Sequence, residues 1–164
     1  MAREFDAREE RFGRYLEEYE VEDRFKHWPG KTVTESDDHL FCLLTLASSP
    51  VHTDAAWGEA HSPYGRNIVV GTYVYALLLG MSVPDISGRA IANLGVSDLR
   101  HLLPLFHGDT LYGETEVLES RLSQSRPNTG VLTVRTDGFN QKSERGCTFV
   151  RSVLLPCIAE RHTS

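Results

Sequence analysis

The sequence predicts an α+β domain because two contrasting patterns follow one another along the chain. The segment from Gly71 to Leu79 is apolar nearly all round, and Pro84 follows closely behind it. A helix without a polar face must be enclosed by the rest of the fold. The second half of the chain changes to the alternating or β-branched pattern of strands. One enclosed helix followed by long strands supports an α+β domain, and periodicity alone does not fix how the sheet meets the helix.

Two elements are expected ahead of residue 35. Within residues 3–20, aromatic and leucine side chains recur at spacings that gather them on one side of a helix, amid Arg and Glu. We therefore expect an amphipathic helical extension over residues 1–20, lying on the domain or on a neighbouring subunit. Residues 21–34 contain a Trp-Pro-Gly turn, and this stretch suits a strand and a turn.

A short helix is expected next. Ser36, Asp37 and Asp38 are residue types that start helices, and apolar residues at helical intervals follow them as far as Ala47. Pro50 should end this helix, because proline has no N–H to donate and its ring restricts the residue before it.

Strand patterns occur in four segments, which we expect to pair antiparallel. They cover residues 90–99, 111–118, 131–137 and 147–155. Turn-forming clusters at residues 125–128 and 140–143 separate the last three strands. The expected layout is therefore a single domain over residues 21–158, followed by a tail at 159–164.

Composition and charge exclude several classes of function. With 164 residues, of which 40% are apolar, the chain has the material for one well-filled core. Its 23 acidic and 17 basic residues leave a formal charge of -6, which opposes phosphate backbones and anionic membrane surfaces. We therefore expect neither nucleic acid nor a membrane as a partner.

The cysteines and histidines do not indicate a metal site or a disulfide. Cys42, Cys147 and Cys157 lie among apolar residues without a CxxC spacing, which is typical of buried free thiols in a reducing compartment. The charged start lacks the apolar core of a signal peptide, so a cytoplasmic location is expected. His101 and His107 have no His or Cys partner at a metal-ligand spacing, so no metal is expected.

Two blocks of sequence carry a family resemblance. The first runs from Leu44 to Asp54, contains the string Ser-Pro-Val-His-Thr-Asp, and continues in residues 64–71 into the apolar helix. The second, from Pro104 to Leu111, has the form Pro-x-x-x-Gly-Asp-Thr-Leu. Both resemble the MaoC-like, (R)-specific enoyl-CoA hydratase family, which includes mesaconyl-type hydratases acting on short branched or dicarboxylic acyl-CoAs. The resemblance covers roughly residues 15–155.

This resemblance implies a fold and an activity. The fold is the hot-dog fold, in which an antiparallel sheet wraps around a central apolar helix. The activity is that of a hydratase or dehydratase on an enoyl-CoA or 3-hydroxyacyl-CoA thioester, by proton transfer through a histidine with a backbone oxyanion hole and with no cofactor. Hot-dog domains generally pair through their sheets, so a homodimer or higher homo-oligomer is implied, or pairing with a homologous hydratase subunit.

Hydration of an enoyl thioester needs a base for water, an acid for the α-carbon and donors for the thioester oxygen. His52 matches the family's catalytic histidine and can exchange a proton near neutral pH; the alternative is a polar loop histidine bonded to backbone. Gly71 matches the glycine whose amide opens the helix and forms the oxyanion hole; the alternative is that it only permits tight entry into a buried helix. The family's aspartate, five positions before its histidine, is replaced by Ala47.

Three further residues are candidates for the site. Asp54 would share a face with His52 in an extended segment and could replace the missing carboxylate, or it caps the helix that follows. Ser49 stands where the family has asparagine and could hold water or substrate, or it belongs to the turn before the proline. Thr72, next to the oxyanion glycine, is a candidate substrate-binding residue.

Three functions fit these residues. In the first, the chain is a working hydratase in which His52 carries the proton, assisted by Asp54 or by a residue of a neighbouring subunit. In the second, it is a module that binds acyl-CoA or an acyl carrier without turnover. In the third, it is the degenerate partner subunit of an active hydratase. The first is preferred because the histidine and the glycine-led helix are both retained.

Overall fold

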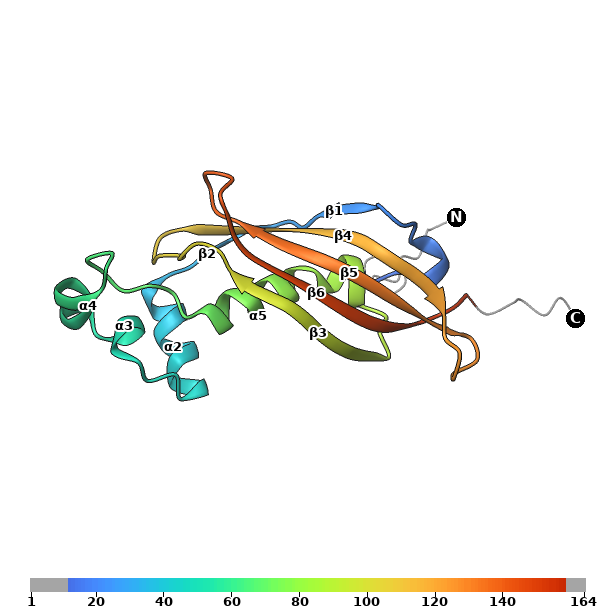
Figure 1. Cartoon of the computed structure of the whole chain (residues 1–164), viewed down its shortest axis with the longest axis horizontal. Coiled ribbons are helices and arrows are strands. Elements are labelled where there is room, and N and C mark those ends of the chain that lie inside the picture. The colour runs from blue at the N-terminus through green and yellow to red at the C-terminus, as the bar shows by residue number, and fades with distance from the viewer. Residues whose placement is uncertain (1–11, 159–164) are drawn as a thin grey trace, which may run out of the picture.

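The computed structural model describes residues 12–158. Short strands and helices come first along the chain, and the long strands come last (Figure 1). The elements are η1 (Leu16–Glu18), β1 (Arg24–Lys26), β2 (Lys31–Thr32), α2 (Glu35–Thr45), α3 (Pro50–Thr53), α4 (Ala55–His61), α5 (Gly71–Met81), η2 (Val83–Ser87), β3 (Ala92–His101), β4 (Thr110–Leu122), β5 (Thr129–Phe139) and β6 (Arg145–Pro156). Between residues 12 and 158, no helix is long and apolar enough to cross a membrane.

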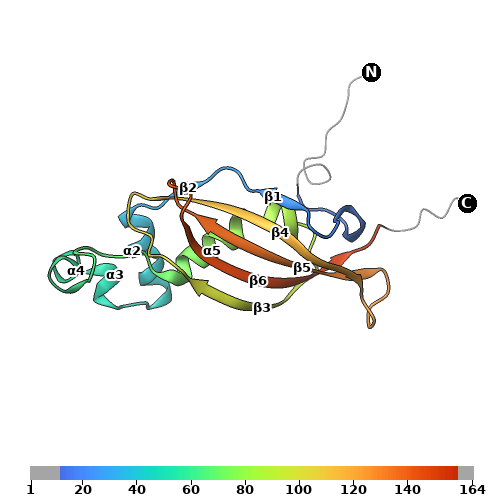
Figure 2. The ribbon, with the colours of Figure 1, turned by 45° about the horizontal axis from the view of Figure 1, so that its top comes forward.

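The strands form an antiparallel sheet in the order β1-β4-β5-β6-β3, and β2 also pairs with β4. β4 and β5 pair from Tyr112↔Phe139 to Leu122↔Gly130, and β6 continues the sheet on the other side of β5. β3 is an edge strand. The sheet curves along α5, which lies against one of its faces (Figures 1 and 2). The predicted antiparallel sheet wrapped around an apolar helix is confirmed.

Helix α5 packs on the sheet through Leu78, which is fully buried. Gly138 on β5 makes room for it, because a Cβ at this position would lie 2.6 Å from Leu78 Cδ1. The core divides into a cluster near the start of α5, around Val74 and Phe149, and another beyond its end, around Ile86. Most other side chains of α5 stay partly exposed, so the sheet alone encloses less of the helix than its all-round apolar pattern predicts.

Helix α2 begins and ends differently from the expectation. Its N-cap is Thr34, whose hydroxyl accepts from the Asp37 amide at 3.2 Å while the Asp37 carboxylate accepts from the Thr34 amide at 3.0 Å. The helix ends at Thr45, because Leu46 takes a left-handed conformation with φ 59°. The prediction that Pro50 ends this helix is wrong. Pro50 begins α3 instead, at a position where the missing N–H has no partner to lose.

The amino-terminal segment differs from the expected amphipathic helix over residues 1–20. Residues 12–20 contain one 3-10 turn, η1, and no longer helix, while residues 1–11 lie outside the described residues. Leu16 and Tyr19 are buried against the sheet. The Tyr19 hydroxyl lies 2.8 Å from the Asp85 carbonyl oxygen and donates to it. The described part of this segment therefore packs on the domain.

Candidate active site

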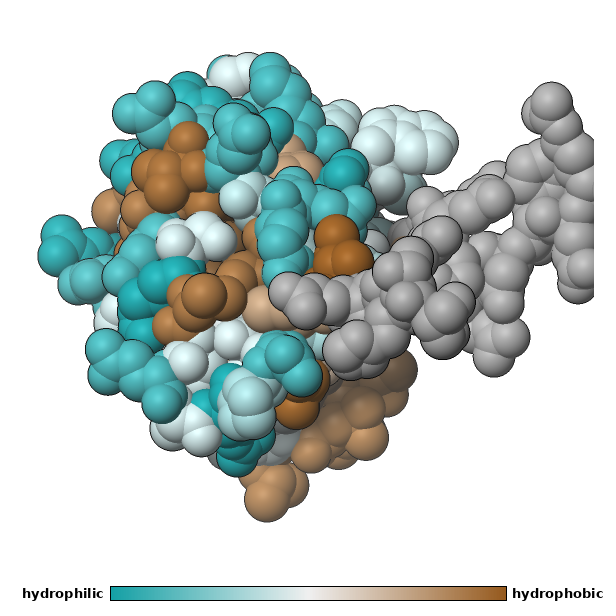
Figure 3. Space-filling model, turned by 90° about the vertical axis from the view of Figure 1, so that its right-hand side faces the viewer, coloured by the Kyte–Doolittle hydropathy of each residue, from teal (hydrophilic) through white to brown (hydrophobic). Residues whose placement is uncertain are grey.

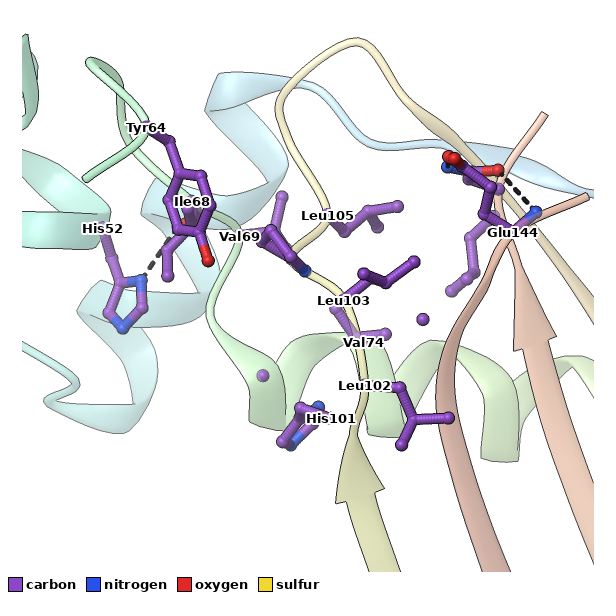
Figure 4. A pocket seen from close by; sticks show the side chains of 15 residues that line it. His52, Tyr64, Ile68, Val69, Val74, His101, Leu102, Leu103, Leu105 and Glu144 are labelled. Atoms are coloured by element: carbon purple, nitrogen blue, oxygen red, sulfur yellow. Dashed lines mark hydrogen bonds between the residues drawn. The ribbon is translucent and has the colours of Figure 1, made fainter. Parts of the chain in front are cut away.

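A cavity of about 340 Å³ lies at the amino-terminal end of α5 (Figure 4). Its lining comes from α3, the segment leading into α5, the first turn of α5, the end of β3 with the loop that follows, the start of β4 and the β5–β6 turn. The polar side chains in its lining are His52, Tyr64, His101, Asn140 and Glu144. Much of the remaining wall is leucine, valine and isoleucine, so the cavity suits a small acyl group with a polar end.

His52 enters the cavity from α3 with a defined tautomer. Its Nδ1 lies 2.9 Å from the carbonyl oxygen of Ile68 (Figure 4). A carbonyl oxygen only accepts hydrogen bonds, so Nδ1 carries a proton and donates it. In the neutral ring, Nε2 is then the unprotonated nitrogen, and it has no hydrogen-bond partner within residues 12–158. The backbone contact expected for a structural histidine is therefore present, and it leaves the basic nitrogen available.

Asn67 holds α3 in place. Its buried side-chain amide donates to the carbonyl oxygens of Val51 at 2.9 Å and Pro50 at 3.1 Å. The amide of Ile68 also donates to the Val51 carbonyl, at 3.2 Å. A helix of one turn has too few internal hydrogen bonds to be stable alone. These contacts fix the orientation of the His52 side chain.

Gly71 is the first residue of α5, and Val70 is its N-cap. The amides of Gly71 and Thr72 have no acceptor among the described residues, as expected at a helix start. A Cβ on Gly71 would lie 2.7 Å from His101 Nε2, so any larger residue would collide with that imidazole. Both interpretations of the glycine are thus compatible: its position is crowded, and its N–H is free to donate.

Asp38 anchors the start of α5 from behind. The carboxylate is fully buried; one oxygen accepts from the Val70 amide at 3.0 Å and the other from His107 Nε2 at 2.9 Å. Two hydrogen bonds of this kind compensate a buried charge. They tie α2, α5 and the loop before β4 together. Sequence reasoning assigned Asp38 only to helix capping, although an acidic residue amid the leucines of α2 was a signal for a buried partner.

The structure brings two of the predicted site residues together and leaves three elsewhere. His52 and Gly71 line the same cavity. Asp54 caps α4, with its carboxylate accepting from the Trp57 amide at 2.9 Å, and it does not line the cavity. Ser49 is the N-cap of α3 without a side-chain hydrogen bond, and Thr72 is exposed. Neither of these two lines the cavity, so the roles of Ser49, Asp54 and Thr72 stay predictions.

The lining contains three titratable side chains that sequence reasoning did not assign to the site: Tyr64, His101 and Glu144. Glu144 is the one carboxylate of the lining, and it accepts from the Asn140 side-chain amide at 2.8 Å. Ala47, at the position of the family's aspartate, is not part of the lining. His101 lies three residues before Pro104, where the second family-like block begins. This proximity was the one feature of the sequence that could have indicated a place for His101 in the site.

A fully buried thiol of the core lies beside the strand that carries His101. Cys147 on β6 pairs with His101 in the β3–β6 register. Burial raises the pKa of the Cys147 thiol to about 11. The thiol is therefore protonated near neutral pH and supplies no charge to the site.

Comparison with known proteins identifies the family. The family model for mesaconyl-CoA hydratase matches residues 2–163. The chain belongs to this family. The mesaconyl-CoA hydratase of Cereibacter sphaeroides is 35% identical over 147 residues, which are 87% of this chain and 41% of that protein. The chain thus spans about two fifths of the length of the Cereibacter sphaeroides protein.

Solved structures agree with this assignment. The MaoC-like dehydratase from Rhodospirillum rubrum superposes with a TM-score of 0.78 at 27% identity, covering 89% of this chain and 99% of that one. A Mycobacterium tuberculosis protein with a double hot-dog fold superposes with a TM-score of 0.77 at 21% identity, covering 93% of this chain and 47% of that one. The chain therefore has the hot-dog fold.

Proposed function

We propose that the chain is a hydratase or dehydratase that acts on an enoyl-CoA or 3-hydroxyacyl-CoA thioester. The observation that carries this proposal is that His52 and Gly71 line one cavity at the start of α5. His52 presents an unprotonated nitrogen, and Gly71 presents a free backbone N–H. These are a base and an oxyanion donor, two of the three groups that hydration requires.

In this mechanism, the thioester oxygen accepts a hydrogen bond from the Gly71 amide. The partial positive charge of the helix start stabilises the negative charge that grows on this oxygen. His52 Nε2 removes a proton from water, whose oxygen bonds to the β-carbon. A proton added to the α-carbon completes the hydration, and dehydration follows the same steps in reverse. Every step is proton transfer or addition, so the reaction requires no metal or organic cofactor.

The substrate we propose is a short branched or dicarboxylic acyl-CoA such as mesaconyl-CoA. A cavity of about 340 Å³ is near the lower end of the usual range for ligand sites, which favours a short acyl group over a long chain. The mesaconyl-CoA activity named for the Cereibacter sphaeroides relative points the same way.

The active assembly we propose contains a second hot-dog domain, either another copy of this chain or a homologous subunit. On α2, the buried residues are Asp38 and Cys42, while Leu43 and Leu44 are 72% and 74% exposed. β3 pairs with β6 on one side only, and its residues are exposed from Asn93 onward. Apolar side chains gather along the lower edge of Figure 3, the side on which α2 and β3 lie in Figure 1. Exposed leucines and an open strand edge are features that a partner domain covers.

The proposal is tested by assay of the purified full chain with mesaconyl-CoA and crotonyl-CoA, following the loss of enoyl absorbance. We expect hydration by the wild type, and a loss of about a hundredfold or more in His52→Gln. The control is His61→Gln, because His61 is an exposed histidine on α4 outside the cavity and its loss should leave turnover unchanged. Equal turnover in wild type and His52→Gln would overturn the assignment of the site.

Two alternatives follow from Ala47, which removes the family's carboxylate. Thioester binding without turnover would identify an acyl-thioester-binding module. Turnover that appears only after addition of a homologous hydratase subunit would identify a degenerate partner. Sedimentation of the same sample reports the oligomeric state, and a monomer that hydrates at full rate would contradict the proposed assembly.

A further inference from the structure

We infer that His101 is the second proton-transfer residue of this site and delivers the proton to the α-carbon. The inference rests on the proposed hydratase function and supplies the group that function lacks. A hydratase needs an acid as well as a base, and the family position for the carboxylate holds Ala47, outside the cavity lining. His101 is in the lining.

The position of His101 relative to Gly71 is suited to this role. Its Nε2 would lie 2.7 Å from a Cβ built on Gly71, so the imidazole edge lies against the residue whose amide receives the thioester oxygen. The α-carbon of a thioester is bonded directly to the carbonyl carbon. A donor beside the oxyanion amide is therefore also beside the α-carbon. Figure 4 shows His101 next to the first turn of α5, with His52 on α3 at another part of the wall.

The backbone of His101 is held while its side chain stays free. The residue ends β3 and pairs with Cys147, and the next amide, that of Leu102, donates to the Gly146 carbonyl at 2.7 Å. Neither ring nitrogen of His101 has a hydrogen-bond partner in the part of the chain that the structure describes. A fixed backbone with a free imidazole provides a donor that does not have to break another hydrogen bond first.

The other titratable side chains of the lining are less well placed. Glu144 is already hydrogen-bonded to Asn140, and Figure 4 shows it across the cavity from the start of α5. The Tyr64 ring packs edge-on against Phe106, with 5.5 Å between ring centroids. A tyrosine hydroxyl also has an ordinary pKa near 10, whereas an imidazole is within reach of both protonation states at neutral pH.

The proton and electron balance closes with these two histidines. Water loses a proton to His52 Nε2, and its oxygen forms the bond to the β-carbon. The π electrons of the double bond move to the α-carbon and the thioester oxygen. The imidazolium of His101 then gives its Nε2 proton to the α-carbon, which breaks the N–H bond and forms the C–H bond. A proton passes from His52 to His101 through water to restore the starting state, and no oxidant or reductant takes part.

The test compares His101→Gln and His101→Ala with the wild type in the full chain. We expect turnover of crotonyl-CoA to fall about a hundredfold or more in both variants, the contribution of a general acid. Affinity for butyryl-CoA, a saturated thioester that cannot be hydrated, should change by about threefold or less, since uniform binding does not depend on the acid. Added imidazole should restore part of the turnover of His101→Ala, because that variant leaves space beside Gly71.

The outcomes separate this inference from the function on which it rests. A wild type without any hydration refutes the proposed function. A working wild type whose His101→Gln variant keeps more than about a third of its turnover refutes only the role of His101. A folded His101→Ala variant that loses turnover and is not rescued by imidazole assigns His101 to packing against Gly71, which also refutes the inference.

Discussion

The two ends of α5 each have a histidine paired with a carboxylate, and they differ in what lies next to the pair. At the carboxyl end, His27 is buried and both ring nitrogens are bonded, Nδ1 to Asp85 and Nε2 to Thr115, each at 2.7 Å. The Thr115 hydroxyl also forms a hydrogen bond with the Thr136 hydroxyl, at 2.8 Å. At the amino end, Asp38 is bonded to His107 and to the Val70 amide, and the neighbours of Val70, Val69 and Gly71, line the cavity.

This difference teaches how to separate supporting from reactive histidines in one fold. Both ring nitrogens of His27 are hydrogen-bonded, so its role is to stabilise the core. His52 and His101 line a cavity, and each has a free Nε2. Reactivity follows from an available nitrogen at a cavity, whereas a fully bonded imidazole indicates structure.

The largest effect should come from exchanging histidine for glutamine at the two ends. His52→Gln is expected to lower turnover by about a hundredfold to ten-thousandfold with little change in melting temperature. His27→Gln is expected to lower the free energy of unfolding by about 1–3 kcal/mol, because it leaves buried polar groups unpaired, while the turnover of the folded protein stays close to wild type. Enzyme assays and urea unfolding measure the two quantities. A His52→Gln variant that loses stability but keeps turnover, together with a folded His27→Gln variant that loses turnover, would contradict the comparison.

The second effect concerns the buried pair behind the cavity. Asp38→Ala removes the acceptor for both the Val70 amide and His107, and we expect a loss of about 3–5 kcal/mol in stability, as for a broken buried ion pair. Asp38→Asn keeps one acceptor oxygen and should lose less. Unfolding curves of both variants test this order. Equal losses would show that the carboxylate charge, and not the acceptor count, dominates.

The strands and α5 were predictable because their patterns are local. Alternation along the chain identifies β4, β5 and β6, and an apolar run after Gly71 identifies α5. The leucines of α2 identified a helix but not which side is covered, and the structure buries Asp38 and Cys42 instead. A helical period says which residues share a face, and only the tertiary fold decides what that face meets.

The candidate site was predictable only where a motif carried it. His52 and Gly71 were found because two blocks of sequence resemble the hydratase family. His101 was missed because its position beside Gly71 arises from the pairing of β3 with β6 and the packing of α5, which connect residues far apart in sequence. No spacing rule reports such a contact. The helix stop at Leu46 was missed for a related reason, because a left-handed leucine has no sequence signature.

The third effect compares two glycines of the same helix. Gly71→Ala places a Cβ 2.7 Å from His101 Nε2, so the exposed His101 side chain must shift. The shift should cost little stability, but turnover should fall about tenfold or more because the imidazole is displaced from the site. Gly80→Ala is the matched control, since nothing lies within 4 Å of its Cβ. The control should gain about 0.5–1 kcal/mol in stability from the better helix former. Undiminished turnover in Gly71→Ala would contradict the crowding at the site.

The smallest effect is a pH dependence at the start of α2, the helix that carries Asp38. The Lys31 ammonium, at 2.6 Å, together with the Thr34 amide lowers the pKa of Asp37 from 3.8 to about 2. Because the pKa of Asp37 is lower in the folded state than in the unfolded chain, the ionised carboxylate stabilises the fold. This stabilisation is fully present above the unfolded pKa and is lost as pH falls from about 4 to about 2. Asp37→Asn should therefore be less stable than wild type by about 1 kcal/mol at pH 7, a capping-sized effect.

The gap between Asp37→Asn and wild type should close as the pH approaches 2, which acid titration of the two unfolding free energies measures. Acid should therefore loosen the α2 side of the molecule through Asp37, and a substrate analogue should oppose that loss because it binds only the folded state. A gap that stays constant down to pH 2 would mean that the Lys31 contact does not stabilise α2.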